Sequence, residues 1–424
     1  MAVVSCDDPK FGARLIPVDE ALQRLSEQVK PVTEAEWVGV SDSLLRVLAE
    51  PVFSTINVPP LANSSMDGYA LRAADLITEP TKSFRVSQRI PAGSVGEYLE
   101  VGTVARIFTG APLPDGADAV VMQEVCTVHE ADSEVSITIS GTVKVGENVR
   151  DAGEDIREND EILSVGHRLA PQDLGLLASV GVTKVKVFKK LRVAVFFTGD
   201  ELREPGEPLG IGQIYNSNRF TLVAMLQRMG CEVINLGIVT DTLEGTIEAL
   251  SQAASQADLV MTSGGVSVGE EDHVKAAVES LGQLDLWSIS IKPGKPLAFG
   301  QINSAGRSVP FLGMPGNPVS VFATTCILGR PFIQAMQGMP FKSVQGFKVP
   351  AAFDLNYIVR RQEYLRVRLQ HDDQGGLVLQ SFPNQSSGVL TSASWGDGFA
   401  IAREGSAVKK GDLLEYLPFS FFDL

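Results

Sequence analysis

Residues 191–202 have the sequence LRVAVFFTGDEL, in which an apolar run ends in a hydroxyl group and two carboxylates. The run from Val193 to Phe197 is short and rich in β-branched and aromatic residues, which predicts a buried strand. Apolar strands and amphipathic helices then alternate to about residue 336. This alternation favours a doubly wound, mainly parallel sheet with helices on both faces, and we expect such an α/β domain over residues 189–338.

Apolar spacing predicts the other elements of this domain. After Asn218, apolar residues recur at helical spacing as far as Met229, and Gly230 ends that helix. Further helices are expected over residues 243–254 and 318–336, and strands over 231–239, 259–262, 284–291, 297–299 and 309–312.

The regions on either side have other patterns. Helical spacing predicts two short helices between Pro17 and Leu48, separated at Pro31, and a later helix that begins at Pro171 and ends at Gly181. Short β-branched runs separated by Gly, Pro and Asp turns predict strands at Ser83–Ile90, Val104–Phe108, Ala119–Gln123 and Val135–Ile139, and in the tail at Phe347–Ala352, Tyr364–Leu369 and Leu413–Tyr416.

We therefore expect a multi-domain α/β plus β protein. Its four predicted domains are a discontinuous, elongated helix and strand domain (14–50 and 151–188), a small β domain (51–150), the α/β domain (189–338) and a C-terminal β-barrel-like domain (339–424).

Composition limits the function. The 424 residues are 44% hydrophobic and 21% charged, as in folded globular proteins with more than one core. A net charge of −15 opposes binding to nucleic acid or to anionic membranes. Apolar runs such as 174–182 stop well short of the roughly 20 residues that span a bilayer. The N-terminus is acidic and the cysteines are scattered, so we expect a cytoplasmic protein that acts on a small-molecule substrate.

Ligands of open α/β sheets bind beyond the carboxyl ends of the strands, so the turns that follow the strands are the first candidates for a site. The turn TGDEL at 198–202 carries a hydroxyl and the carboxylates of Asp200 and Glu201, which suit a metal ion or a ribose. The alternative is a strand-end turn with solvated acids. The motif alone leaves both interpretations open.

A second turn, TSGGVSVGEED at 262–272, has three glycines and three hydroxyls ahead of a helix. Exposed amides of this kind can cradle a phosphate, and Asp272 can bind a cation that the phosphate holds. Alternatively, the glycines form a tight turn and Asp272 caps the helix that begins at His273. The GxSxG pattern at 265–269 matches a nucleophile elbow only formally, because the helix starts too late for the serine to stand at the turn.

Two further turns are rich in proline and glycine. GMPGNP at 313–318 has a fixed backbone, which suits either rigid recognition or a stiff connection. KPGKP at 292–296 keeps Lys292 and Lys295 at a turn, because its prolines forbid a regular helix. In an acidic chain these lysines are a candidate anion site, and a solvated turn is the alternative.

Outside the α/β domain, three segments add candidates. NSSMDGYA at 63–70 places Asp67 among small hydroxyls, TGAP at 109–112 places Thr109 at a turn, and RDAGED at 150–155 surrounds a glycine with Arg150 and three acids. Each signal is weak alone. HExxH, Walker A and GxGxxG motifs are absent from the sequence, so a phosphate, carboxylate and metal chemistry is favoured over a nucleophilic one.

Taken in order, these motifs closely resemble the MoeA family of molybdopterin molybdenumtransferases. The motifs that carry the resemblance are NSSMDGYA (63–70), TGAPLPDGADAVVMQE (109–124), GED (153–155), TGDEL (198–202), SGGVSVGEEDH (263–273), KPGKP (292–296) and GMPGNP (313–318). The resemblance implies an enzyme of molybdenum cofactor biosynthesis that takes adenylylated molybdopterin and molybdate, inserts molybdenum at the dithiolene and releases AMP. It also implies a divalent cation, usually Mg²⁺.

The resemblance also implies roles for individual residues. Catalytic candidates are Asp67, Thr109, Glu201 and Asp272, and metal-ligand candidates are Glu201, Asp241 and Asp272. Substrate-binding candidates are Ser263, Gly264, Gly265, Ser267, Gly269, Lys292, Lys295, Pro315, Gly316, Asn317, Pro318, Arg150 and Asp155. The chain departs from the family pattern at Asp151, where relatives often carry a second basic residue, which weakens the case for anion binding by that segment.

The α/β domain also resembles the molybdopterin adenylyltransferase fold, so adenylyltransferase activity is one alternative function. A non-catalytic scaffold, like the related domain that clusters receptors in animals, is another. The lack of an adenylyltransferase fusion or a long linker favours the enzyme. The resemblance further implies a homodimer with sites shared between subunits, and transient contact with the molybdopterin adenylyltransferase and with acceptor molybdoenzymes.

Overall fold

The computed structural model describes residues 15–78, 83–131, 134–265 and 273–423. These residues form two compact units. The first unit takes the described parts of Met1–Glu36, Leu45–Ala49 and Val187–Leu424, and the second takes Trp37–Leu44 and Glu50–Lys186. The finer division into four domains stays a prediction.

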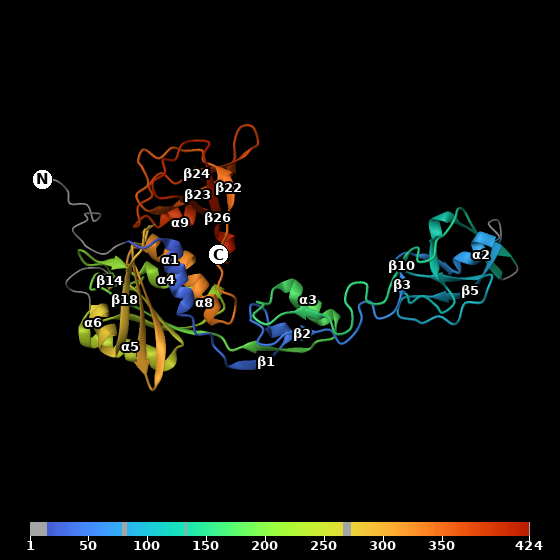
Figure 1. Ribbon diagram of the computed structural model, residues 1–424, viewed down its shortest axis with the longest axis horizontal. Helices are drawn as coiled ribbons and strands as arrows, with labels where there is room; N and C mark the ends of the chain where they lie inside the picture. The colour runs from blue at the N-terminus through green and yellow to red at the C-terminus, as the bar shows by residue number, and fades with distance from the viewer. Residues whose placement is uncertain (1–14, 79–82, 132–133, 266–272, 424) are drawn as a thin grey trace. The chain divides into compact units, whose positions relative to one another are not determined.

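A six-stranded sheet forms the centre of the first unit (Figure 1). In spatial order its strands are β16 (Glu232–Val239), β13 (Arg192–Thr198), β17 (Leu259–Ser263), β21 (Arg307–Met314), β20 (Pro296–Ser304) and β18 (Gly282–Ser288). The first three neighbouring pairs are parallel, and the pairs β21–β20 and β20–β18 are antiparallel. The α/β prediction is therefore confirmed, with two antiparallel strands at one edge that the sequence pattern did not reveal.

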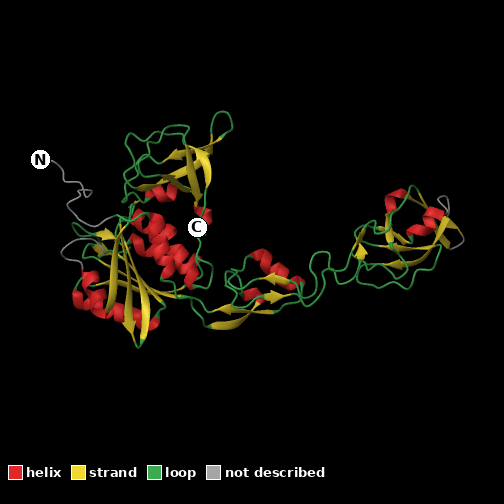
Figure 2. Cartoon of the chain, in the orientation of Figure 1, coloured by secondary structure: helices red, strands yellow, loops and turns green. Residues whose placement is uncertain are grey.

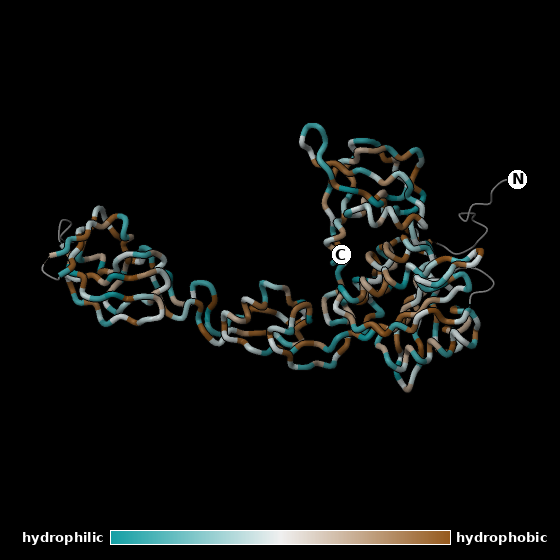
Figure 3. The backbone as a smooth tube through the Cα atoms, turned by 180° about the vertical axis from the view of Figure 1, so that it is seen from behind, coloured by the Kyte–Doolittle hydropathy of each residue, from teal (hydrophilic) through white to brown (hydrophobic). Residues whose placement is uncertain are grey.

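Helices cover both faces of this sheet (Figure 2). The helices are α1 (Val18–Glu27), α4 (Ser217–Arg228), α7 (Pro318–Thr324) and α8 (Arg330–Met336) on one side, and α5 (Leu243–Gln256) and α6 (His273–Leu281) on the other. Along β13, Val193 and Val195 face the first set of helices, whereas Ala194 and Phe196 face the second. Because both faces are buried, the strand is continuously hydrophobic rather than alternating. Figure 3 colours the backbone by hydropathy and shows hydrophobic segments within the first unit.

The predicted helix over 318–336 is helical throughout, but a π-helical segment, η3 (Thr325–Gly329), separates α7 from α8. The run Pro318–Met336 is long and apolar enough to cross a membrane, yet 94% of its apolar window is buried inside the protein. It is therefore a core helix of the first unit.

The C-terminal region forms a second six-stranded sheet. Its strands are β19 (Ile291–Lys292), β23 (Gln362–His371), β25 (Gly398–Ala402), β26 (Leu413–Pro418), β22 (Phe347–Pro350) and β24 (Leu377–Ser381), with α9 (Thr391–Trp395) and η4 (Phe419–Phe422) beside them. Strand β19 contains Lys292, the first residue of the lysine turn. Lys292 pairs with Glu363 of β23 in parallel register. The strand pairing thus attaches KPGKP to this sheet.

The second unit is built on a six-stranded sheet of order β7-β4-β6-β5-β9-β8. These strands are β7 (Ala119–Met122), β4 (Gly68–Leu71), β6 (Thr103–Ile107), β5 (Ser83–Ile90), β9 (Glu134–Ile139) and β8 (Cys126–Ala131). Smaller elements are α2 (Ala73–Thr78), α3 (Pro171–Ser179), η2 (Gln123–Val125), the pair β3 (Asn63–Ser64) with β10 (Val149–Arg150), and the pair β2 (Val52–Phe53) with β11 (Glu161–Leu163). The strands predicted for this unit at 83–90, 104–108, 119–123 and 135–139 are all found within two residues of their expected ends. In the first unit, the strand predicted at 284–291 ends at Ser288 and the one predicted at 297–299 extends to Ser304.

The second of the two predicted N-terminal helices is wrong. Residues 35–42 form strand β1 (Ala35–Gly39) and a short 3₁₀ turn, η1 (Val40–Asp42). Trp37 and Val38 favour extended backbone, and the N–H of Val40 donates to the carbonyl of Thr183 rather than to a helical neighbour. Remaining short strands are β12 (Lys184–Phe188), β14 (Leu202–Arg203) and β15 (Ile214–Tyr215).

Candidate functional site

The carboxyl ends of β13, β17 and β21 lie next to one another. In the parallel register Phe197 is opposite Ser263, and Ser263 is opposite Met314. The turns that begin at Thr198, Gly264 and Pro315 therefore leave the sheet at the same edge, as expected for a ligand site in an open α/β sheet.

Two of the predicted metal-ligand carboxylates, Glu201 and Asp241, lie in the turns after β13 and β16. The hydroxyl of Thr198 donates to Oδ1 of Asp241 at 2.8 Å, which connects TGDEL to the turn after β16. The carboxylate of Glu201 folds back over Gly199, where a Cβ atom would collide with it. Gly199 therefore makes room for Glu201 beside Thr198.

Ser263 joins the glycine turn to the proline turn. Its hydroxyl donates to the carbonyl of Pro315 at 3.1 Å, and the N–H of Gly264 donates to the carbonyl of Met314 at 3.2 Å. A Cβ at Gly265, which has a φ of +63°, would collide with Val274. Glycine is thus required where this turn passes the helix α6. The candidates Ser267, Gly269 and Asp272 lie outside the described residues.

Asn218, in the first turn of α4, holds the same two turns. Its Nδ2 donates to the hydroxyl of Ser263 at 2.9 Å and to the carbonyl of Gly316 at 2.7 Å. Its Oδ1 is buried and has no hydrogen-bond partner among the described residues. An acceptor of this kind can accept a hydrogen bond from a ligand. The sequence analysis used Asn218 only as a helix start, and the signal it missed was the polar triplet Asn216–Asn218 at a helix N-terminus.

The lysine turn packs against the proline turn. Gly294 has a φ of +108°, and its Cα–H side faces Pro315, Ser320 and Thr324, where a Cβ would collide with the Thr324 methyl group. Pro318 occupies the first position of α7, and Asn317 precedes it without a side-chain cap. The prolines and glycines of both turns therefore bring KPGKP and GMPGNP together.

Lys292 is not a free cation. Its Nζ lies 3.0 Å from Oε1 of Glu363 and 5.1 Å from the centre of the Tyr357 ring. The Tyr357 hydroxyl donates to Oε2 of Glu363 at 2.8 Å, and burial together with this bond raises the pKa of Tyr357. The anion-site prediction did not include this carboxylate, which holds the ammonium group in place. The backbone carbonyl of Lys295 accepts a hydrogen bond from the N–H of Ile289.

Arg366 is a further residue that the motifs did not reveal. It is 1% exposed, and its guanidinium donates to the hydroxyl of Ser392 and to the carbonyls of Tyr364 and Ser386. Burial lowers its pKa to about 10, so it stays a cation at neutral pH. The backbone carbonyl of Ser387, the residue after Ser386, accepts a hydrogen bond from the N–H of Val319 at the start of α7. This loop is thereby fixed beside the proline turn.

In the second unit, Asp67 and Thr109 contact each other directly. The backbone N–H and the hydroxyl of Thr109 both donate to Oδ1 of Asp67 at 2.8 Å. These bonds stabilise the ionised carboxylate and hold the pKa of Asp67 below its usual value, with a smaller effect from the charge of Arg106. The pair of candidates from two distant motifs is therefore one polar centre.

Arg150 and Asp155 lie on the same side of the second unit as the segment before Asp67. Arg150 pairs with Asn63 in the β10–β3 ladder, and the N–H of Asp155 donates to the carbonyl of Val58. No ion pair links Arg150 to the acids of 151–155, all of which are described. The segment is therefore not a turn closed by salt bridges to Arg150.

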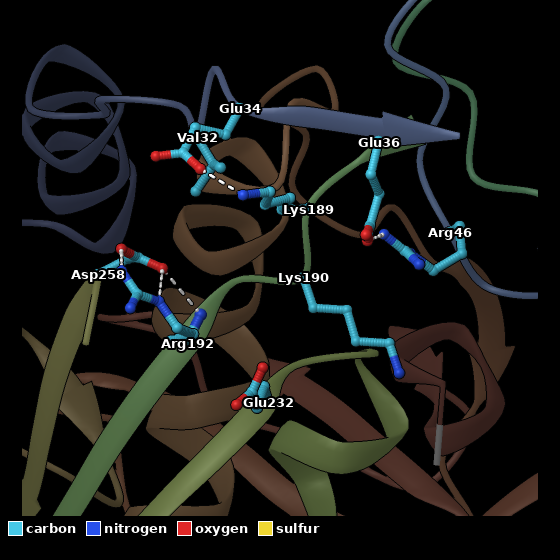
Figure 4. A pocket seen from close by; sticks show the side chains of 9 residues that line it. All are labelled: Val32, Glu34, Glu36, Arg46, Lys189, Lys190, Arg192, Glu232 and Asp258. Carbon is cyan, nitrogen blue, oxygen red and sulfur yellow. Dashed lines mark hydrogen bonds and ion pairs between the residues drawn. The ribbon is translucent and has the colours of Figure 1, made fainter. Parts of the chain in front are cut away.

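A separate cavity of about 390 Å³ lies at the opposite, amino ends of the parallel strands (Figure 4). It is lined by four acids and four bases, and three ion pairs cross it: Glu34 with Lys189, Glu36 with Arg46, and Asp258 with Arg192. These pairs lower the pKa of Glu34 and raise those of Lys189 and Arg192. Because its charges cancel within the cavity, we assign the functional site to the carboxyl ends of the strands instead.

Comparison with known families covers the chain in the same order as the motifs. The model of the MoeA N-terminal region (domain I and II) matches residues 16–181, that of a probable molybdopterin binding domain matches 194–335, and that of the MoeA C-terminal region (domain IV) matches 348–419. A protein of Haemophilus influenzae named molybdopterin molybdenumtransferase is 40% identical over 96% of this chain and 99% of its own length. The chain belongs to the MoeA family.

Other MoeA relatives agree. The Bacillus subtilis protein of the same name is 34% identical over 75% of this chain and 74% of its own length. The crystal structure of a molybdopterin biosynthesis MoeA protein from Pyrococcus horikoshii has a TM-score of 0.78 at 27% identity, and covers 95% of this chain and 99% of that one. The multi-domain fold predicted from the motifs is therefore that of the MoeA family.

The first prediction from this site concerns the Asp67 carboxyl. Thr109→Val removes the hydroxyl but keeps the backbone N–H, so the pKa of Asp67 should rise toward its ordinary value of about 3.9. NMR titration of the carboxyl carbon measures it. Since the folded-state pKa is depressed, ionised Asp67 stabilises the fold above the unfolded-state pKa, and this contribution disappears as the pH falls through the folded-state pKa. Thr109→Ser should keep the pKa low; an unshifted pKa in Thr109→Val would mean that the hydroxyl has no effect.

The second prediction concerns the Lys292–Glu363 pair. Glu363 is 5% exposed, so Lys292→Met leaves a buried carboxylate with Tyr357 as its remaining side-chain partner. We expect a loss of roughly 1–2 kcal/mol of unfolding free energy, discounted because the lysine is 37% exposed. Adding Glu363→Gln to Lys292→Met should recover most of this loss in denaturant unfolding at pH 7. Strictly additive effects of the two substitutions would show that the pair is not coupled.

Proposed function

We propose that the protein is a molybdopterin molybdenumtransferase that takes adenylylated molybdopterin and molybdate and releases AMP. The observation that carries the proposal is the convergence of four family motifs on one edge of the first unit: TGDEL, the glycine turn, KPGKP and GMPGNP meet through Thr198, Ser263, Asn218 and Gly294. The name of the Haemophilus influenzae relative, which matches over nearly its whole length, supports the reaction.

The site fits an anionic substrate. Lys292, and with it Lys295, supplies positive charge at a turn that contains two prolines. Glu363 and Tyr357 orient the Lys292 ammonium group, so less side-chain entropy is lost when an anion binds. Water hydrolyses the diphosphate bond of the substrate and frees AMP. The two dithiolene thiols bind molybdenum in place of one oxo group of molybdate, which leaves with their two protons as water.

The residues also fit a divalent cation. Among the described residues no group of three potential metal ligands is found, but Asp241 and Glu201 are hard oxygen donors from turns at neighbouring strand ends. Mg²⁺ is commonly held by one or two carboxylates together with substrate phosphates and water. We propose that Asp241 and Glu201, with Asp272, hold this ion, which would neutralise charge on the diphosphate. In that arrangement Thr198 fixes the carboxylate of Asp241.

We further propose that two copies of the chain associate, that each site takes Asp67 and Thr109 from one copy and Asp241 and Lys292 from the other, and that the enzyme works in the cytoplasm. The ionised Asp67 is then suited to position water at the substrate. Arg150 and Asp155 are proposed to support the same end of the second unit. Delivery of the product to acceptor molybdoenzymes belongs to this proposal.

The activity test follows AMP. Purified protein with adenylylated molybdopterin, Mg²⁺ and molybdate should release AMP, and should release little without molybdate. Asp67→Asn and Asp241→Asn should lower the rate about 10²-fold or more. Asp285→Asn, which changes an exposed carboxylate of β18, should not. Adenylylation of molybdopterin from ATP by this protein alone would support the adenylyltransferase instead, and an inert protein that binds only peptides would support the scaffold.

The shared-site proposal has its own test. Asp67→Asn and Asp241→Asn chains, each inactive alone, are unfolded together and refolded. Random mixing makes half of the dimers mixed, and each mixed dimer has one intact site, so about a quarter of wild-type AMP release should return. If mixed dimers are confirmed by mass and no activity returns, both residues belong to sites within one copy.

A further inference from the structure

One face of the sheet in the second unit carries a row of cationic and aromatic side chains. Arg89 of β5 is in register with Arg106 of β6, and Arg106 is in register with Tyr69 of β4. Residues in register on neighbouring strands point to the same face of a sheet. Arg85 precedes Arg89 on β5, and together these side chains line a groove of about 530 Å³.

The arginines of this groove are held by aromatic rings. The guanidinium carbons of Arg89 and Arg106 lie 4.6 and 4.7 Å from the centre of the Phe108 ring, and that of Arg106 also lies 5.1 Å from the Tyr69 ring. Arg106 donates to the carbonyl of Gly68 and to the side-chain oxygen of Gln123. Stacking fixes a guanidinium plane and leaves its N–H edge available, which is how arginine recognises phosphate.

The positive charge of the groove is only partly compensated. Neither Arg89 nor Arg106 has a carboxylate within ion-pair distance among the described residues, and Arg85 approaches Glu100 only at 3.9 Å. Glu130 and Glu134 line the groove as well, so its lining has three cations and two anions. In a chain of net charge −15, Arg89 and Arg106 side by side on one face are an exception to the overall charge.

The rest of the lining is apolar or neutral. Val86, Val128 and Val135 contribute side chains to it, next to Ser87 and Gln88. A volume of about 530 Å³ is far larger than a phosphate needs and lies within the range of small-molecule sites. Guanidinium planes and valine side chains offer a surface for a flat heterocycle, while the arginine N–H groups suit an anion.

We propose that this groove binds a nucleoside monophosphate group, with the phosphate on Arg89 and Arg106 and the base against the valine side of the groove. The groove adjoins the Asp67–Thr109 centre, because Arg106 bonds to Gly68 and Phe108 precedes Thr109. On the proposed function, on which this step of the inference rests, the group is the AMP half of adenylylated molybdopterin. The arginines then hold the leaving phosphate beside Asp67.

Direct binding tests the inference without turnover. Calorimetric titration of the full chain with AMP should give a site that weakens about tenfold or more in Arg89→Gln and in Arg106→Gln. Arg24→Gln, which removes an exposed, ion-paired arginine of α1, should leave the affinity unchanged. Thermal unfolding of each variant checks that the fold is intact. Hydrogen exchange should show that AMP protects residues 83–90 and 103–109 in the wild type and no longer does so in the variants.

Further probes define the ligand. Inorganic phosphate and adenosine should each bind more weakly than AMP, because each reaches only part of the groove. Phosphate that binds as tightly as AMP would overturn the nucleoside part of the inference, and an AMP affinity that both arginine variants retain would overturn all of it. AMP release by variants with unchanged AMP affinity would leave the proposed function standing without this groove. Arginine-dependent AMP binding without any molybdate-dependent turnover would support the groove and contradict the proposed function.

Discussion

The parallel register of β13, β17 and β21 is the constraint on which the site of the first unit depends. It aligns Phe197, Ser263 and Met314 in one row, so that three turns start at the same level. A slip of one residue would exchange the two buried faces of a strand and move the Ser263 hydroxyl away from Pro315. Both faces are packed with apolar side chains, so such a slip costs burial on both sides. The hydrophobic core therefore fixes the geometry of a polar site.

Charged candidates of both units are held by a neighbouring polar group. Thr109 donates twice to Asp67, Thr198 donates to Asp241, and Glu363 accepts from Lys292. Such partners fix the charge before substrate arrives, so little reorganisation is required during reaction. The opposite case is the cavity at the amino ends of the strands, where ion pairs satisfy one another. Among the described residues, the candidate site differs from that cavity in having a buried acceptor without a partner, Oδ1 of Asn218.

Local patterns were sufficient to predict most elements and the turns that gather at the carboxyl ends of the parallel strands. A continuous apolar run such as 193–197 indicates a strand buried on both faces, and proline and glycine mark where turns begin. Long-range pairing was not predictable in the same way. The antiparallel β20 and β18, the strand β1 in place of a helix, and the partners Glu363 and Asn218 all depend on residues far away in the chain. Sequence motifs identify candidate ligand-binding residues better than they identify the distant residues that position them.

The order in which the chain visits its two units affects how it is made. The chain passes between them at residues 36/37, 44/45, 49/50 and 186/187, so the second unit is an insertion within the first. On the ribosome, residues 50–186 emerge as one nearly complete folding unit. Helix α1 emerges before them, but Val32 bonds to Met336 and Ile16 to Ser288, hundreds of residues later. The apolar side of the N-terminal helix therefore stays uncovered until synthesis is nearly finished. Exposed apolar surface of this kind is what chaperones bind.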